Sequence, residues 1–477
     1  MRALAIDQGT TSTRAFVVDE SGIRPVHAVE HRQYYPHSGH VEHDPEELLS
    51  SIRACLDAAP DVDCVGIDNQ GESCLAWDAH SKQAITPVIV WQDDRTANVC
   101  EQLQQQGFEP IVRERAGLPL DPYFSASKFG WILQNVSEAK ELARLGRLRL
   151  GTTDAFFRDR LADNFATDPT TASRTSLMNL RTREWDPELC RIFGVPMEAL
   201  PPIRPTSGCL GGLPNGAPLT ASIVDQQAAL FGHGARLPGH AKITFGTGAF
   251  ALVLTDELQD GGMLLPTIAW AESGVEPMHA LDGGVYAASS AVNWSRNLGL
   301  FDEWSQIDQF ACEAAISRGL VFVPALAGLA APHWDRSARG AWFGLGLDTT
   351  RIDMVQAVLE GIAFRVAEVL AEMEKRVTIL APISIDGGMS RNPWFCQFIA
   401  DVLGRQISVS GEVELTALGC GQLAARGAGG ELPYRPAARI IDPRPIPATW
   451  AETFRAAREA AQQFGMSGVS TDGPKSA

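Results

Sequence analysis

The chain has 477 residues, which is more than one hydrophobic core usually supports, so two large domains with a cleft between them are expected. Apolar residues make up 45% and charged residues 20% of the sequence, a composition typical of a globular protein and not of a disordered one. The formal net charge of −17 argues against a nucleic-acid surface and against docking on an anionic membrane. No apolar run is long enough to be inserted into a membrane.

The cellular compartment is indicated by the cysteines and by the first residues. The nine cysteines form no Cys-x-x-Cys pair, which predicts free thiols and neither a disulfide framework nor a metal site. The chain starts with a strand pattern at residues 3–6 and shows no leader-like segment. We therefore expect a cytoplasmic protein.

Short apolar runs alternate with helical patterns in the first hundred residues. The runs 2–6, 14–19, 64–68 and 87–91 are bounded by Gly, Pro, Asp or Asn and are predicted to be strands. Residues 45–58 and 95–106 are predicted to be helices, and 107–222 is expected to be more irregular. The alternation favours an α/β sheet covered by helices.

A strand-turn-strand pattern occurs twice. Asp7-Gln-Gly-Thr-Thr leads into the apolar residues 15–18, and Phe245-Gly-Thr-Gly-Ala-Phe leads into 251–254. Units more than 200 residues apart indicate two halves of one architecture facing each other. The predicted domains are residues 1–235 and 236–440, followed by a segment 441–477 with a C-terminal helix and, from Ser467, a tail whose composition predicts disorder.

Two features of the second half are structural predictions. An apolar stripe from Leu359 to Met373 recurs every three or four residues, as in a long core helix. After the strand-like residues 383–386 come two glycines and then Asn392 and Pro393, which are typical N-cap and first-turn residues of a helix.

Two glycine-containing turns are candidate phosphate sites. In the first turn, the hydroxyls of Thr10, Thr11 and Ser12 can reach phosphate oxygens, Arg14 can add a charged contact, and Asp7 can hold a hydrated Mg²⁺. On its own, the same pattern is more often that of a polar hairpin turn. The second turn, around Thr247, is a weak signal alone, but paired with the first across a cleft it indicates a clamp on a polyphosphate.

Other polar groups are candidates with a structural alternative. Asp225 precedes an apolar helix and is either an N-cap or a general base that accepts a proton from a hydroxyl. The Asp386-Gly-Gly turn either admits a planar ligand or only joins a strand to a helix. Polar and aromatic side chains also gather at predicted strand ends, in 69–72, 91–95 and 121–123. Gly-x-Ser-x-Gly, His-Glu-x-x-His and Walker A sequences are absent, which disfavours serine hydrolases, zincins and P-loop enzymes.

Together these motifs resemble the FGGY carbohydrate kinases, and within them the glycerol kinase branch, from Asp7 to about Ala424. Residues 123–135 look like the first signature of that family, and 340–345 through Glu360 look like the second. The resemblance implies an actin-like, ribonuclease H-like fold in duplicate with a central cleft. It also implies transfer of the γ-phosphoryl group of MgATP to a terminal hydroxyl of glycerol or a related small polyol, with a homo-oligomer possible.

The resemblance assigns roles to individual residues. Asp225 would be the catalytic base and Asp7 would organise Mg²⁺. The acceptor would be bound by Glu72, Trp91, Tyr123, Asp225, Gln226 and Phe250. ATP would be bound by Thr10, Thr11, Ser12, Arg14, Thr247, Ser289, Asn293, Gly388 and Asn392.

Two positions depart from the glycerol kinase pattern. Gly71 stands where an arginine usually binds glycerol hydroxyls, which leaves room for a longer acceptor. Asp93 stands where a cysteine is usual and is expected to accept hydrogen bonds from additional hydroxyls. A pentulose or pentitol kinase therefore remains the alternative, and a non-catalytic sensor on the same fold is a third reading.

Overall fold

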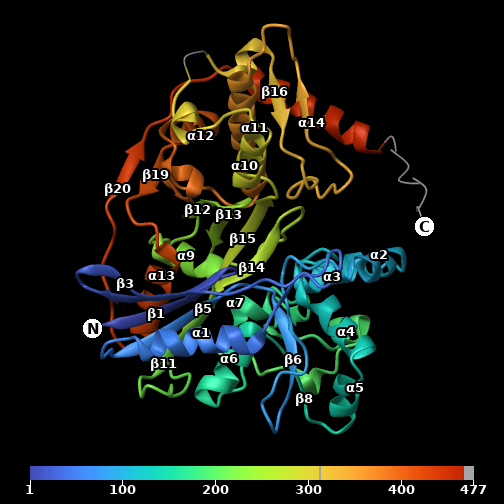
Figure 1. The fold of residues 1–477 in the computed structure, drawn as a ribbon, viewed down its shortest axis with the longest axis vertical. Helices are drawn as coiled ribbons and strands as arrows, with labels where there is room; N and C mark the ends of the chain where they lie inside the picture. The colour runs from blue at the N-terminus through green and yellow to red at the C-terminus, as the bar shows by residue number, and fades with distance from the viewer. Residues whose placement is uncertain (311–312, 467–477) are drawn as a thin grey trace.

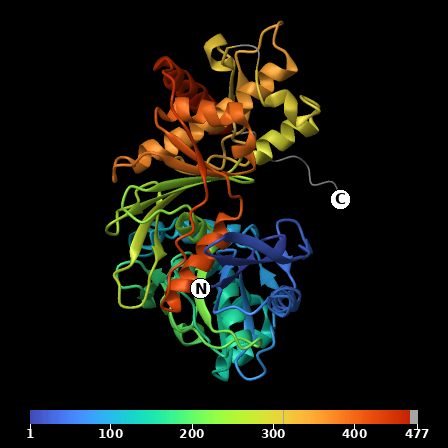
Figure 2. The ribbon, with the colours of Figure 1, turned by 90° about the vertical axis from the view of Figure 1, so that its left-hand side faces the viewer.

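The computed structural model describes residues 1–310 and 313–466, and they form two large β-sheets, one above the other, with helices around both (Figure 1). The tail predicted from Ser467 lies outside the described residues. Figure 2, turned by 90°, shows most of the later part of the chain above the upper sheet and the N-terminus at the level of the lower one.

The lower sheet has the strand order β11-β5-β1-β2-β3. The central strand β1 pairs antiparallel with β2 and parallel with β5, and β11 pairs parallel with β5. The bounds of these strands are β1 Ala3–Gln8, β2 Ser12–Asp19, β3 Gly22–Glu30, β5 Cys64–Asn69 and β11 Leu219–Val224.

The upper sheet repeats this arrangement around β12, which pairs antiparallel with β13 and parallel with β18. Its order is β14-β15-β13-β12-β18-β19-β20. Its strands are β12 Ala241–Phe245, β13 Ala249–Thr255, β14 Leu265–Trp270, β15 Met278–Val285, β18 Ile383–Gly387, β19 Ile407–Ser410 and β20 Ala438–Ile441. The shared pattern of a hairpin beside parallel strands confirms the predicted duplication.

The helices cover the outer faces of the sheets and fill the space between them. They are α1 Pro45–Asp57, α2 Ala97–Gln105, α3 Glu109–Ala116, α4 Ser125–Asn135, α5 Ser137–Arg144, α6 Thr153–Ala162, α7 Pro169–Ala172, α8 Pro187–Phe193, α9 Asp225–Gly232, α10 Ser289–Asn297, α11 Arg351–Met373, α12 Pro393–Leu403, α13 Leu415–Gly427 and α14 Thr449–Met466. The long helix expected around Leu359 is α11. Asn392 caps α12 as predicted, because its side chain accepts a hydrogen bond from the Phe395 N–H at 2.8 Å.

The first half differs from the prediction in two places. Residues 107–222 are more regular than expected, since they contain α3 to α8 and also β8, which joins three strands from before residue 107 in a small sheet of order β4-β7-β6-β8. The strand predicted at 87–91 contains only β7 Val88–Ile89, which pairs with the two-residue strand β4 and, on its other side, with β6 at one position. The other strands of the small sheet are β4 Glu42–His43, β6 Cys74–Asp78 and β8 Leu148–Thr152, and two-stranded ribbons join β9 Met178–Asn179 to β10 Glu184–Trp185 and β16 Val321–Val323 to β17 Ala341–Phe343.

Helices α9 and α13 lie between the two large sheets and cross each other closely (Figure 1). A Cβ atom at Gly419 would lie 1.9 Å from the Ala228 carbonyl oxygen, and one at Gly232 would lie 2.0 Å from the Leu415 carbonyl oxygen. Glycine is therefore required on both helices at this crossing. One hydrophobic cluster at this level joins residues of both sheets, including Ala5 and Leu252.

Two predicted properties can be compared with the described residues. Among them, no helix combines the length and apolar composition needed to cross a bilayer. The eight cysteines in this part of the chain are all free thiols, and all except Cys209 are buried.

The helix crossing gives a stability prediction. We expect Gly419→Ala to lower the free energy of unfolding by about 1–3 kcal/mol, because the added methyl group has no space. The matched control is Gly212→Ala, since a Cβ there meets no atom within 4 Å. Urea denaturation of both variants measures the difference, and equal midpoints would show that the crossing tolerates a side chain.

Candidate active site

Three aspartates lie at the carboxyl ends of the parallel strands of the lower sheet. Alternate residues of a strand share one face, so Asp7 follows Ala3 and Ala5 on the face covered by α13. Asp68 is the register partner of Asp7 on β5. Asp225 directly follows β11, as the first residue of α9. The three carboxyl groups therefore meet at one edge of the sheet, where ligands of α/β sheets bind.

Asp225 does not act as the N-cap of α9, because Val224 occupies that position. One carboxylate oxygen of Asp225 accepts a hydrogen bond from the Gln226 N–H at 2.6 Å. Burial, reinforced by the charges of Asp7 and Glu72, raises the pKa of Asp225 to about 7. A carboxylate that ionises near neutral pH is suited to accept a proton.

Asp68 belongs to this group although no motif singles it out. It is fully buried, and within the described part of the chain neither of its carboxyl oxygens forms a hydrogen bond. Burial and the charges of Asp7 and Asp225 hold the pKa of Asp68 well above its ordinary range. Burial beside two other carboxyl groups therefore favours the protonated form of Asp68.

The first glycine turn joins the antiparallel strands β1 and β2, as the hairpin reading predicts, and it lies at the strand edge next to Asp7. The turn is closed by the Gly9 N–H, which donates to the Ser12 carbonyl at 3.0 Å. The Arg14 guanidinium binds the Asp7 carboxylate at 2.5 Å and Glu414 of the second half at 2.7 Å. Thr11 is exposed, and Thr10 accepts a hydrogen bond from the Trp91 indole N–H at 3.2 Å.

The second turn joins β12 to β13 and leaves Gly246 and Thr247 exposed. The start of α10 is attached to it, because the Ser289 N–H donates to the Gly246 carbonyl at 3.1 Å. Gly388 faces Ser289: a Cβ built on Gly388 would lie 4.0 Å from the Ser289 hydroxyl oxygen.

The remaining predicted nucleotide residues lie on nearby elements. Asn293 is exposed on α10. The Asn392 side chain caps α12 and also donates to the Ile307 carbonyl at 2.7 Å, so its amide is already used within the chain. The structure thus brings Thr247, Ser289 and Gly388 together, with Asn392 in a supporting position.

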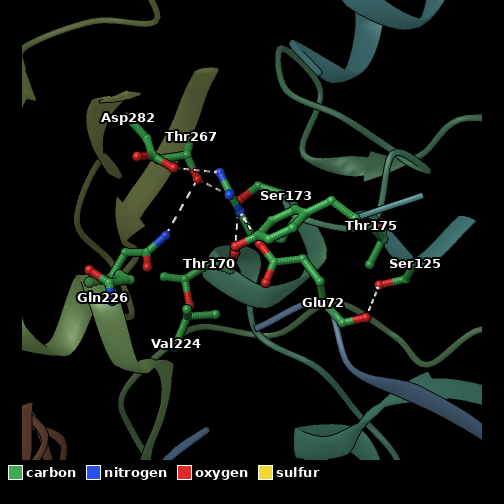
Figure 3. Close-up of polar contacts among 12 residues, drawn as sticks. Glu72, Ser125, Thr170, Ser173, Thr175, Val224, Gln226, Thr267 and Asp282 are labelled. Atoms are coloured by element: carbon green, nitrogen blue, oxygen red, sulfur yellow. Dashed lines mark hydrogen bonds and ion pairs between the residues drawn. The ribbon is translucent and has the colours of Figure 1, made fainter. Parts of the chain in front are cut away.

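The predicted acceptor residues surround a buried arginine. The Arg174 Nε donates to a Glu72 carboxylate oxygen at 2.6 Å, and its Nη1 lies 3.1 Å from an Asp282 oxygen on β15. Glu72 and Asp282 both pair with this guanidinium, and Figure 3 shows the two acidic side chains in one cluster of polar contacts. Glu72 has a φ of 59°, a strained conformation for a non-glycine residue and one that is common at functional sites.

Charge balance keeps this cluster together. Burial raises the pKa of Glu72 and of Asp282, and Arg174 opposes both effects. Burial also disfavours the charge on Arg174, but the two carboxylates keep its pKa above the ordinary value. One oxygen of Asp282 has no partner within the described residues and remains available to a ligand hydroxyl or to water.

The aromatic acceptor residues line the same region. The ring centroids of Trp91 and Tyr123 are 5.6 Å apart, and the ring planes meet at 65°, which is an edge-on contact. The Arg174 guanidinium lies 5.9 Å from the centroid of the Tyr123 ring. Phe250 faces Gly284, where a Cβ would come within 3.1 Å of its ring. Glycine at position 284 thus leaves the space that the Phe250 ring occupies.

Asp93 is placed differently from its predicted role. Its side chain is buried and accepts hydrogen bonds from the Val41 N–H at 2.6 Å and from Arg95 at 2.7 and 2.8 Å. Both oxygens are therefore occupied within the chain. In this structure Asp93 fixes Arg95 and does not present a free oxygen to additional hydroxyls.

Sequence reasoning missed Lys242 and Asp282 and gave Arg174 no role of its own. Lys242 and Asp282 are charged residues within otherwise apolar strands, and that contrast is the signal that identifies them. A buried charge must be paired, so a charged residue in such a strand indicates a partner nearby. The partner itself cannot be read from the sequence, because Arg174 and Asp282 are far apart in the chain.

Arg174 gives a stability prediction. Arg174→Met leaves two buried carboxylates without their cation, which should cost about 3–5 kcal/mol at neutral pH. The loss should shrink as the pH falls, because protonation of Glu72 and Asp282 removes the unpaired charges. Urea denaturation at neutral and at acidic pH tests this, with the exposed Arg144→Met as control. A loss that is the same at both pH values would contradict it.

Comparisons with known proteins agree with this geometry. The model of the FGGY family of carbohydrate kinases, N-terminal domain, matches residues 2–232, and that of the C-terminal domain matches residues 241–428. The chain is 42% identical to a glycerol kinase from Thermus brockianus over 96% of this chain and 98% of that protein. It is 40% identical to glycerol kinase 1 from Pseudomonas aeruginosa over 89% of this chain and 90% of that protein.

Solved structures show the same fold. Plasmodium falciparum glycerol kinase with ADP superposes with a TM-score of 0.90 and 30% identity, covering 97% of this chain and 98% of the other. A xylulose kinase from Lactobacillus acidophilus reaches a TM-score of 0.85 at 21% identity, covering 98% and 99%, and shows the fold alone. The chain therefore belongs to the FGGY family of carbohydrate kinases and is an ATP-dependent kinase.

Proposed function

We propose that this kinase transfers the γ-phosphoryl group of MgATP to a terminal hydroxyl of glycerol or a related small polyol. The observation that carries this proposal is the position of Asp225. Its carboxylate ionises near neutral pH and lies beside the Glu72 and Gln226 side chains, at the strand ends from which the first glycine turn also starts. The glycerol kinases at about 40% identity support the acceptor class.

The residues present fit a nucleotide. The exposed turn at Thr247 offers a hydroxyl and backbone N–H groups, and glycine is needed beside it because a Cβ at Gly248 would lie 2.5 Å from the Val285 carbonyl oxygen. The open space next to Gly388 admits a planar ring, with Ser289 at its edge. We infer that Thr10, Thr11, Ser12 and Thr247 hold the phosphates and that Gly388 and Ser289 hold the adenosine.

The residues present also fit Mg²⁺. Hard carboxylate oxygens are the ligands that this ion prefers, and Asp7 supplies them at the strand edge beside the unpartnered oxygens of Asp68. When bound with the nucleotide, the ion neutralises charge on the phosphoryl group. Arg14 pairs with Asp7, so its positive charge lies in the same region, which supports placing the phosphates there.

The remaining steps follow from the chain's own residues. The Asp225 carboxylate accepts the proton of the acceptor hydroxyl as its oxygen attacks phosphorus. Glu72 keeps one oxygen on Arg174, so its other oxygen can accept a hydrogen bond from a second acceptor hydroxyl. Trp91, Tyr123 and Phe250 supply apolar surface that excludes competing water.

A pentulose or pentitol kinase is the second candidate, and Gly71 favours it. A Cβ at this buried position would already meet Val224 at 3.3 Å, so the chain carries no arginine beside Glu72 and lacks the donor expected there for a short polyol. The missing donor supports an acceptor other than glycerol.

The acceptor is tested by measuring ADP release from MgATP with glycerol, dihydroxyacetone, erythritol, pentitols and pentuloses. We expect a three-carbon polyol to give the highest kcat/KM. A preference for a pentulose would replace the first candidate by the second. Turnover of none of them, with ATP still bound, would favour a sensor.

The role of Asp225 is tested by Asp225→Asn. The isosteric amide cannot accept the proton, so turnover should fall by about 10²- to 10⁴-fold while ATP affinity is retained. The control is Asn297→Asp, because Asn297 is exposed. Unchanged turnover of Asp225→Asn would exclude Asp225 as the base.

A further inference from the structure

Lys242 is a charged residue inside β12 with no exposed surface. Its ammonium group donates to the Gln226 Oε1 at 2.6 Å and to the Thr244 hydroxyl oxygen at 2.8 Å. Alternation along the strand explains its direction, because Ile243 and Phe245 pack into the upper core while Lys242 and Thr244 face the opposite side, toward α9. Lys242 thus connects the upper sheet to the helix that carries Asp225.

The surroundings of Lys242 explain why a cation is held there. Three carboxyl groups act on it, namely Asp386 on β18, Asp225 on α9 and Asp282 on β15. Burial disfavours the ammonium form, and these carboxylates favour it. Burying the lysine ammonium group costs desolvation energy that an apolar residue in this strand would avoid. A role for Lys242 beyond packing is therefore expected.

The chemistry of the ammonium group fixes the orientation of the Gln226 amide. A lysine side chain donates hydrogen bonds and cannot accept them while protonated, so the amide oxygen of Gln226 must face Lys242. The amide nitrogen of Gln226 then points away and donates. Gln226 directly follows Asp225, and so a donor and a proton acceptor stand on consecutive residues at the start of α9.

We propose that Lys242 is a positioning residue that orients the Gln226 amide to donate to an acceptor hydroxyl oxygen next to the Asp225 carboxylate. This inference rests on the proposed function. The reacting hydroxyl then has a donor on one side and an acceptor on the other: the Gln226 nitrogen donates to its oxygen and Asp225 accepts its proton. Glu72 accepts a hydrogen bond from a second hydroxyl of the acceptor. Lys242 touches neither substrate and acts through Gln226.

The test is a double-mutant cycle of Lys242→Met and Gln226→Ala, with KM measured for the acceptor and for ATP. Each single variant should raise the acceptor KM about tenfold, the effect of one lost hydrogen bond to a buried group, while the ATP KM stays within about twofold. The double variant should be no worse than Gln226→Ala alone, because both changes remove the same contact. Effects that multiply would overturn the proposal.

Two further variants keep the result clear if Lys242→Met does not fold. Gln226→Glu keeps a partner for Lys242 but has no N–H donor, so it should raise the acceptor KM about as much as Gln226→Ala does. An unchanged KM in Gln226→Glu would overturn the proposal. Thr244→Val removes the other partner of Lys242 and should leave the acceptor KM unchanged.

The wild-type chain separates the two levels of the argument. If it phosphorylates a polyol and the variants do not follow the expected pattern, the role of Lys242 is wrong and the proposed function stands. If it phosphorylates none of the acceptors, the proposed function and the role of Lys242 both fall.

Discussion

The active site depends on one constraint: carboxyl groups are crowded into a buried space between two sheets. Burial raises the pKa of Asp68, Glu72, Asp225 and Asp282, and neighbouring carboxylates add to this effect at Asp68, Glu72 and Asp225. Carboxylates this close must share protons or be paired with cations, or the fold loses stability. Buried cations contributed by both halves of the chain meet this requirement, and the same pairing leaves Asp225 able to ionise near neutral pH.

The duplicated topology explains how groups so distant in sequence come together. Parallel strands on one side of each hairpin bring their carboxyl ends to one edge, and the α9–α13 crossing holds the two sheets in contact. The acceptor-side carboxylate Glu72 belongs to the lower half, while Asp282 and Lys242 belong to the upper half. Arg174 and Lys242 therefore stabilise the site and the junction at the same time, so a change at either one is expected to affect both.

Much of this could be predicted from local sequence. The glycine turns, the long helix α11 and the Asn392 cap have short-range signals, because hydrophobic period and turn chemistry are encoded within a few residues. The orientation of side chains could not be predicted in this way. Asp93 was expected to face a ligand, but its oxygens are taken by Arg95 and Val41, a pairing that depends on how β4 meets the loop after β7. Asp68 was overlooked because an aspartate at a strand end is ordinary until its neighbours are known.

The central claim is that burial and neighbouring carboxylates tune Asp225 to act as a base. The most direct measurement is the pH dependence of kcat/KM for the preferred acceptor, because it reports the ionisation of the free enzyme. The account predicts activity that falls about tenfold per pH unit below about pH 7, where Asp225 becomes protonated and cannot accept the hydroxyl proton. Activity that stays constant from about pH 5 to about pH 8 would contradict it, since a base of ordinary carboxyl pKa is ionised throughout that range.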